Sequence, residues 1–174
     1  MKFCEIKRRV RTEIVYLRPV LIGICAGVCV LLGAIFAVGL VGKPSVILLP
    51  RAVLPSFVGV LLQFLAYALF GASFGILLAM PFYGENTKML RAQKKWAIVL
   101  FACLLVLCYS WFPVVNKAGS FLLGILLCGV ILVGLAVLIL FVHRISVLCT
   151  ASLVLFSLWV VYLLYFTVLL LAFF

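Results

Sequence analysis

The sequence predicts an all-α integral membrane protein, a bundle of five transmembrane helices with its N-terminus in the cytoplasm. Three observations predict this fold: the composition, the spacing of the apolar stretches and the placement of the basic residues. The 174 residues are 70% hydrophobic and 10% charged, whereas a soluble domain carries about 25% charged residues. Because too few polar side chains remain to cover a water-facing surface, the composition excludes a soluble enzyme, a disulfide-stapled secreted domain and a disordered chain.

Five stretches without Lys, Arg, Asp or Glu account for the apolar residues. They span residues 20–41, 54–80, 96–112, 121–142 and 146–174. A membrane-spanning helix needs about 20 such residues, and a helix satisfies its own backbone hydrogen bonds in lipid. The stretches are too evenly apolar for the alternating strands of a membrane barrel. We therefore expect residues 1–174 to form one transmembrane domain.

Each stretch has a feature that supports its assignment as a helix. The first apolar run is longer than the 7–15 residues of a signal peptide, so we expect it to be retained. The second and the fifth exceed the length needed to cross the bilayer, which predicts tilting. Trp96 and Trp111 bracket the third, as interfacial aromatic residues do. The fourth runs from Phe121 to Val142 without a charge.

The basic residues predict the orientation. Eleven Lys and Arg fall in the N-terminal segment, the second loop and the fourth loop, and three (Lys43, Arg51 and Lys117) fall on the other side. Because Lys and Arg are enriched in cytoplasmic loops, the N-terminus is expected inside and the C-terminus outside, in a bacterial cytoplasmic membrane. The charge of +11 thus reports topology and attraction to anionic lipid, and nucleic acid is not an expected partner.

Acidic residues are almost missing, which argues against catalysis. The chain has no Asp, and Glu5, Glu13 and Glu85 all lie outside the predicted spans. Proton-coupled carriers keep an ionisable group within the membrane, so such a transporter is disfavoured. The single histidine, His143, is expected at the interface, and no catalytic triad or metal site can be assembled. The chain is therefore not expected to be an enzyme, and no catalytic or metal-binding residue is predicted.

Cysteines and glycines are interpreted as packing residues. Six of the seven cysteines lie within or beside apolar stretches, where a thiol behaves as a small hydrophobic group. Gly23 and Gly27, and likewise Gly71 and Gly75, are spaced so that two helix backbones can approach closely. This spacing is compatible with a homodimer and equally with packing inside one chain.

Aromatic residues in mid-membrane positions point to a ligand site. Trp159, Tyr162 and Tyr165 lie near the middle of the fifth stretch, where the interfacial aromatic belt does not account for them. Gln63 and Tyr67 share one face of the second stretch. The indole, phenol and amide groups of these side chains need hydrogen-bond partners when they are buried. A flat apolar ligand with a few hydrogen-bonding groups would supply such partners. Plain aromatic packing remains the alternative.

At these residues the chain resembles the TspO/MBR family, the tryptophan-rich sensory proteins and mitochondrial translocator protein. The resemblance covers all five stretches in order. It rests on Lys43-Pro44, on residues 54–71 from Leu54-Pro55 through Gln63 and Tyr67 to Gly71, on residues 108–113, on residues 141–146 and on residues 155–167. The family pattern has tryptophan at Gln63 and asparagine at Cys108.

The resemblance implies an intramembrane cavity that opens toward the first loop and takes porphyrins, other tetrapyrroles or sterols. Trp111 and Trp159 would stack on the ligand, and Gln63 and Tyr67 would offer hydrogen bonds. Because Gln63 replaces a tryptophan implicated in porphyrin breakdown, porphyrin degradation is not expected. The predicted ligand-binding residues are Phe57, Gln63, Tyr67, Cys108, Trp111, Trp159, Tyr162, Leu163 and Phe166.

The resulting hypothesis is a membrane receptor or carrier for a planar hydrophobic ligand, such as protoporphyrin or haem, without an obligatory cofactor. Its expected partners are the lipid bilayer, this ligand and, as an option, a second copy of the chain. Two alternatives stay open. One is a ligand-free membrane scaffold or assembly protein with a core filled by side chains, and the other is a small secondary transporter.

Overall fold

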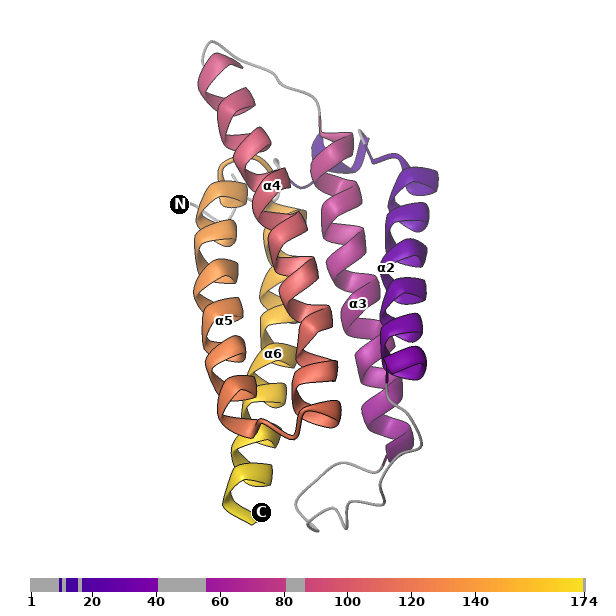
Figure 1. Cartoon of the computed structure of the whole chain (residues 1–174). Coiled ribbons are helices and arrows are strands. Elements are labelled where there is room, and N and C mark those ends of the chain that lie inside the picture. Colours follow the sequence, from indigo (N-terminus) through magenta and orange to yellow (C-terminus); the bar gives the residue numbers. More distant parts are fainter. Residues whose placement is uncertain (1–9, 11, 16, 41–55, 81–86, 174) are drawn as a thin grey trace.

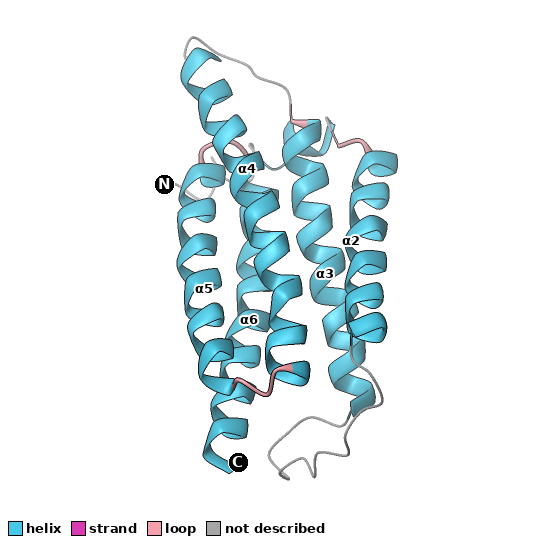
Figure 2. Ribbon diagram, in the orientation of Figure 1, coloured by secondary structure: helices cyan, strands magenta, loops and turns pink. Residues whose placement is uncertain are grey.

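Long helices run side by side in a bundle (Figure 1), and every described regular element is helical (Figure 2). The computed structural model describes residues 10, 12–15, 17–40, 56–80 and 87–173; within these ranges the side chains of 36–40, 56–57, 87–88 and 116–117 are outside the description. The elements are α2 (Pro19–Leu40), α3 (Ser56–Ala79), α4 (Thr87–Phe112), the π-helical turn η1 (Pro113–Lys117), α5 (Phe121–His143) and α6 (Val147–Phe173). The predicted all-α class is confirmed.

Four helices of the described part are long and apolar enough to cross a membrane, so the chain is an integral membrane protein. The segments are Val58–Ala79, Met89–Val115, Phe121–His143 and Val147–Phe173, and α2 is apolar over Pro19–Ile35. α4 begins at Thr87, earlier than the apolar stretch that starts at residue 96. The reason is that hydropathy marks the limits of the apolar segment, whereas the helix continues into its basic flank.

The helices pack in an order that differs from their order in the chain. α2 packs on α3, α3 on α6, α6 on α5 and α5 on α4. α4 comes close to α2 and α3 along a short part of its length only. α6 therefore lies between α3 and α5, and its position determines how the two halves of the bundle meet (Figure 1).

Two glycines of α3 bring it into backbone contact with α2. A Cβ atom added at Gly71 would lie 2.5 Å from the carbonyl oxygen of Cys25, and one at Gly75 would lie 2.7 Å from the Cα of Ile22. Small residues permit such close approach, which drives helix association in lipid. This glycine pair thus serves packing within the chain. By contrast, nothing lies within 4 Å of a Cβ built at Gly23.

Aromatic side chains fill the wider space between α3, α4 and α6. The ring of Phe70 lies 5.0 Å from that of Phe101 on α4 and 4.6 Å from that of Phe156 on α6. Phe74 adds a second contact with Phe101, at 5.3 Å. These separations suit the offset and tilted arrangements that aromatic pairs prefer. Because Phe70 and Phe156 are each 1% exposed, side chains fill this part of the interior.

Glu13, from the segment before α2, binds the N-terminus of α6. Its carboxylate accepts hydrogen bonds from the Ser146 hydroxyl at 2.9 Å and from the backbone N–H groups of Val147 at 2.9 Å and Leu148 at 3.1 Å. The first N–H groups of a helix lack partners within the helix and carry a partial positive charge. A buried carboxylate satisfies both needs, and it ties the start of the chain to its last helix.

Lys94 performs the complementary role at the C-terminus of α3. Its ammonium group donates hydrogen bonds to the carbonyl oxygens of Leu78 at 3.1 Å and Met80 at 3.0 Å. Cations are favourable at this end of a helix, where carbonyl groups lack partners. Glu13, Lys94 and the α5–α6 turn lie at one end of the bundle, which we call the Glu13 end; η1 lies at the opposite end.

We predict that Gly71→Ala lowers the thermal stability of the protein in detergent, because the new methyl group meets the backbone of α2. Overpacking of this kind costs about 1–3 kcal/mol. Gly23→Ala is the matched control, since the same methyl group meets nothing within 4 Å there. Thermal unfolding followed by size-exclusion chromatography compares the two variants. Equal melting temperatures would contradict the close approach of α2 and α3.

We also predict that Glu13→Ala destabilises the protein by about 1–3 kcal/mol, the range for leaving buried hydrogen-bonding groups unsatisfied. Ser146→Ala should have a smaller effect, and the double variant should lose less than the sum of the two, because both residues share one hydrogen-bond network. Reversible unfolding in mixed detergent micelles measures the free energy of unfolding of the two single variants and of the double variant. Strict additivity would show that the carboxylate does not act through Ser146.

Candidate functional site

A groove of about 270 Å³ lies on the outer surface of the bundle, between α3 and α6. Its walls are almost entirely apolar. The lining residues are Leu62, Leu65, Ala66, Leu69, Leu155, Leu158, Trp159 and Tyr162. Because both helices contribute residues from near their middle, and a helix rises 1.5 Å per residue, the groove lies near the mid-depth of the helices.

Packing of α3 against α6 produces the groove. Ala66 is 4% exposed, and its small side chain leaves a depression between the leucines that flank it on α3. On α6, Leu155 and Leu158 are exposed and form the opposite rim. The rim side chains of a membrane-spanning helix face lipid, so the groove opens toward the acyl chains of the bilayer.

Trp159 and Tyr162 are the two predicted site residues that line this groove. Their rings lie 5.3 Å apart with an interplanar angle of 31°, and together they form an aromatic wall. The indole Nε1 of Trp159 is buried and has no hydrogen-bond partner among the described residues. A buried donor without an acceptor is unfavourable.

Tyr67 and Cys108, also predicted as site residues, lie in the packed interior. Tyr67 is 1% exposed; its ring lies 5.2 Å from that of Tyr109 and 6.4 Å from that of Phe156. Gly33 of α2 makes room for these rings, since a Cβ there would lie 3.0 Å from Tyr67. Tyr67 and the buried Cys108 thus contribute to packing between helices and not to the groove.

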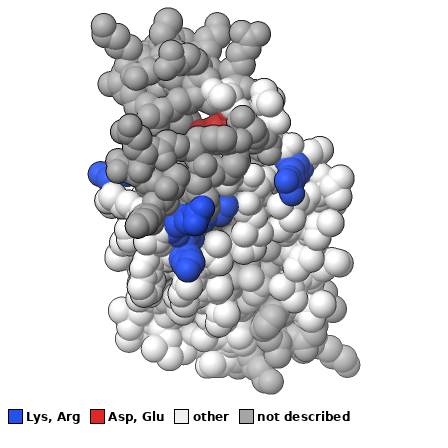
Figure 3. All heavy atoms as spheres, turned by 90° about the horizontal axis from the view of Figure 1, so that it is seen from above, with Lys and Arg blue, Asp and Glu red and all other residues white. Residues whose placement is uncertain are grey.

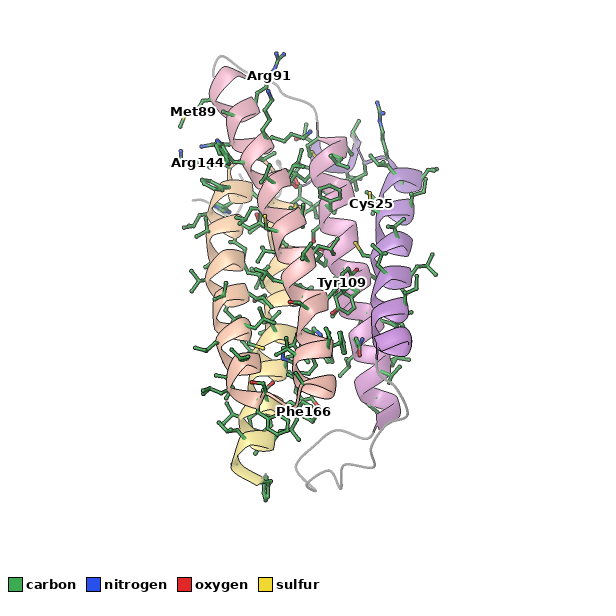
Figure 4. The ribbon with its side chains drawn as sticks, in the orientation of Figure 1. Cys25, Met89, Arg91, Tyr109, Arg144 and Phe166 are labelled. Carbon is green, nitrogen blue, oxygen red and sulfur yellow. The ribbon has the colours of Figure 1, made fainter. Side chains whose placement is uncertain are left out.

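Tyr109 connects the interior to α2, and it was not among the predicted residues. Its hydroxyl donates a buried hydrogen bond of 2.6 Å to the carbonyl oxygen of Cys29. Figure 4 places Tyr109 on α4 well inside the length of the bundle. The sequence could have pointed to Tyr109, because a tyrosine within an apolar span needs a partner for its hydroxyl, just as Tyr162 does.

Phe166 lies nearer the end of the bundle opposite the Glu13 end (Figure 4), and Trp111, just before η1, lies beside it. Their rings are 6.5 Å apart, and Trp111 is 3% exposed. Gly124 of α5 lets Val115 and Thr167 approach closely beside this pair, because a Cβ there would lie 2.6 Å from Val115 and 3.0 Å from Thr167. The Trp111 Nε1 also makes no hydrogen bond to a described residue.

The other predicted residues take separate positions. Gln63 is half-buried on α3 and follows the groove residue Leu62. Leu163 is half-buried on α6, where its carbonyl oxygen accepts the Thr167 hydroxyl at 2.7 Å. The side chain of Phe57, and the first loop expected to cover the cavity, lie outside the described residues. The structure therefore divides the predicted site between the groove, the interior and the Trp111 cluster.

The groove presents an apolar surface with few hydrogen-bonding groups. Its lining offers apolar surface, two aromatic rings, an indole N–H and a phenol. Within the described part of the chain, no three His, Cys, Asp or Glu side chains gather as metal ligands would. The described cysteines are free thiols.

No family model, curated protein or solved structure matches this chain.

We predict that Tyr109→Phe destabilises the bundle, because α2 loses its buried hydrogen bond to α4. Hydrogen bonds between membrane helices contribute about 0.6 kcal/mol on average and up to about 1.7 kcal/mol. Tyr165→Phe is the matched control, since Tyr165 is 49% exposed on α6. The free energy of unfolding in detergent should be lower for Tyr109→Phe than for the wild type, and it should be unchanged for Tyr165→Phe. The reverse ranking would contradict this role of Tyr109.

Proposed function

We propose that this chain is a membrane receptor or carrier that binds a planar hydrophobic ligand, such as a porphyrin or another tetrapyrrole, with a sterol as the alternative ligand. The proposal places the ligand in the groove between α3 and α6. The observation that carries it is the aromatic wall of Trp159 and Tyr162 beside an apolar groove at the mid-depth of the helices. A flat ring system can stack on such a wall, while its edges contact the leucines.

The buried indole N–H of Trp159 supports a ligand that is not purely hydrocarbon. This donor has no partner among the described residues, and a small movement of the ring would present it to an acceptor atom at the edge of a bound ligand. Apolar surface with a few polar groups is the usual make-up of a small-molecule site. We assign the groove a binding role and no catalytic one, because its lining holds no nucleophile paired with a base.

The proposal includes five membrane spans, with α2 as the first, and membership of the TspO/MBR family as a divergent member. The described Lys and Arg side chains lie at the Glu13 end of the bundle (Figure 3). Because basic residues mark the cytoplasmic side, we propose that the Glu13 end is cytoplasmic, in a bacterial inner membrane. The groove would then be reached from within the bilayer.

A scaffold without a ligand is the competing function, and one observation favours it. Tyr67, Phe70 and Phe156 are each 1% exposed, so the interior they share is filled by side chains as a purely structural bundle requires. The two functions differ at the groove: a scaffold has no need for saturable binding of a small molecule there. Transport would need a further observation, namely flux coupled to an ion in liposomes.

We predict that purified protein binds protoporphyrin saturably, as measured by quenching of tryptophan fluorescence, and that Trp159→Ala weakens this binding at least tenfold. The physical reason is the loss of the stacking surface, since aromatic contacts contribute about 0.5–1.5 kcal/mol beyond the area they bury. Trp96→Ala is the control, because Trp96 is 66% exposed and lies far from the groove, near the Glu13 end.

A second pair of variants locates the site. Leu62→Trp should fill the groove and block binding, whereas Leu126→Trp adds the same bulk to the exposed face of α5 and should leave binding intact. Absence of saturable binding to the wild type would overturn the receptor proposal. Binding that survives both Trp159→Ala and Leu62→Trp would overturn the assignment to the groove.

A further inference from the structure

The groove between α3 and α6 lies far from the charged side chains that the structure describes. It extends from Leu62 to Leu69 on α3, which is about 10 Å along the helix axis. The described Lys and Arg side chains lie at the Glu13 end (Figure 3), where Figure 4 places Arg91 and Arg144. Among the described lining residues of the groove, none carries a charge. A bound ligand therefore meets no ionised side chain among them.

Both walls of the groove give the same distance from the Glu13 end. On α3, the Lys94 ammonium group contacts the carbonyl oxygen of Leu78, twelve residues beyond Ala66. On α6, the helix begins at Val147, twelve residues before Trp159. At 1.5 Å per residue, each separation is about 18 Å along the helix axis. The cations of the Glu13 end are therefore too far away to pair with a group in the groove.

The other end of α3 is at a comparable distance. Ten residues, about 15 Å along the axis, separate Ala66 from the start of α3 at Ser56. Since the hydrocarbon core of a bilayer is about 30 Å thick, Ala66 lies near its centre. A ligand in the groove is therefore bordered by acyl chains on its open side and by leucines on the other, remote from the water at both membrane surfaces.

An ionised carboxylate at this depth would lack compensation. Charged groups are strongly disfavoured at the bilayer centre unless they pair with another charge or reach the surface. The described lining offers two side chains with hydrogen-bonding groups, Trp159 and Tyr162, and both are uncharged. A propionate has two methylene groups, so it bridges only a small part of the distance to either end of the bundle. The groove therefore discriminates against anions through the cost of their desolvation.

We propose that the groove takes its ligand in an uncharged form, an inference that rests on the receptor or carrier function proposed for this groove. The ligand class is then a flat ring system whose polar groups are hydroxyl, carbonyl or ester groups, such as a sterol or an esterified tetrapyrrole. Protoporphyrin enters the groove with both of its propionic acid groups protonated. The indole and phenol of the lining can donate to a neutral oxygen, but they cannot neutralise a carboxylate.

A comparison of protoporphyrin with its dimethyl ester tests the proposal, because the two ligands share one ring system and differ in charge. Quenching of tryptophan fluorescence measures their binding to the wild-type protein in nanodiscs of neutral lipid. Protein-free nanodiscs give the partition of each ligand, so that affinities refer to ligand already in the bilayer. At pH 8 we expect the ester to bind at least tenfold more tightly than the acid, because an ionised group is strongly disfavoured at this depth.

The pH dependence provides a second measurement on the same protein. Lowering the pH from 8 to 6 should strengthen binding of the acid at least tenfold and leave binding of the ester unchanged. The reason is linkage: a carboxyl group that becomes neutral on entering the groove takes up a proton, so its binding is favoured as the pH falls. Tyr162 is the one titratable residue in the described lining, and a phenol stays protonated over this range.

Variants assign the selectivity to the groove. Leu62→Trp should remove saturable binding of the ester, whereas the matched variant Leu126→Trp, on the exposed face of α5, should keep both the binding and the preference. A preference for the ester that persists in Leu62→Trp would overturn the inference, because the selectivity would then belong to another site. If Leu62→Trp does not fold, Trp159→Ala serves the same purpose.

The outcomes separate this inference from the proposed function. Equal affinities for acid and ester at both pH values, with both ligands lost in Leu62→Trp, would overturn the inference and leave the receptor proposal standing. Tighter binding of the acid would overturn it as well, since it would require a cation at the site. Absence of saturable binding of either ligand to the wild type would overturn the proposed function and this inference together.

Discussion

The contact between Glu13 and the N-terminus of α6 is the interaction on which the arrangement of the bundle depends most. α6 is the helix that packs on both α3 and α5, and it supplies the aromatic wall of the groove. Where the start of a helix is shielded from water, its first N–H groups need an acceptor from the protein itself. Glu13 provides it and is itself buried. Loss of this carboxylate would leave the first N–H groups of α6 without their acceptor and so weaken the placement of the groove wall that α6 carries.

The same constraint accounts for three polar side chains that connect helices by donating to backbone carbonyl groups. Lys94 donates to the carbonyl groups that end α3, Tyr109 donates to Cys29, and the Cys149 thiol donates to the carbonyl oxygen of Ser73 at 3.0 Å. Lipid supplies no hydrophobic force that drives helices together, so close backbone packing and such hydrogen bonds hold the bundle together. Gly71 permits the tightest approach, that of α3 to α2, while large aromatic rings set the wider spacing of α4 from α3.

Much of the fold could be predicted from the sequence because long apolar stretches leave the backbone no choice in lipid. The helix ends could not be predicted in this way, as at α4, where the helix extends through Arg91 into the basic flank. The site was harder to predict. Helical periodicity groups Gln63 with Tyr67 on one face, but it cannot tell which neighbouring helix that face meets. Tyr67 meets Tyr109 and Phe156 in the interior, whereas Trp159 meets the groove. That difference depends on the packing order of the helices, in which α6 lies beside α3, and no local pattern encodes it.

The division of the aromatic residues has a consequence for how a ligand would be held. Rings in the interior, such as Tyr67 and Phe156, already contact one another, so a ligand could enter there only by displacing packed side chains from several helices at once. Trp159 and Tyr162 form their pair within α6 and keep an open side toward Ala66 on α3. A ligand arriving through the bilayer would meet this side without disturbing the contacts that hold the helices. A hydrophobic ligand is already concentrated among the acyl chains, so it would reach a lateral groove at this depth by a shorter route than it would reach the packed interior. Rigid packing behind the groove would limit the entropy lost on binding.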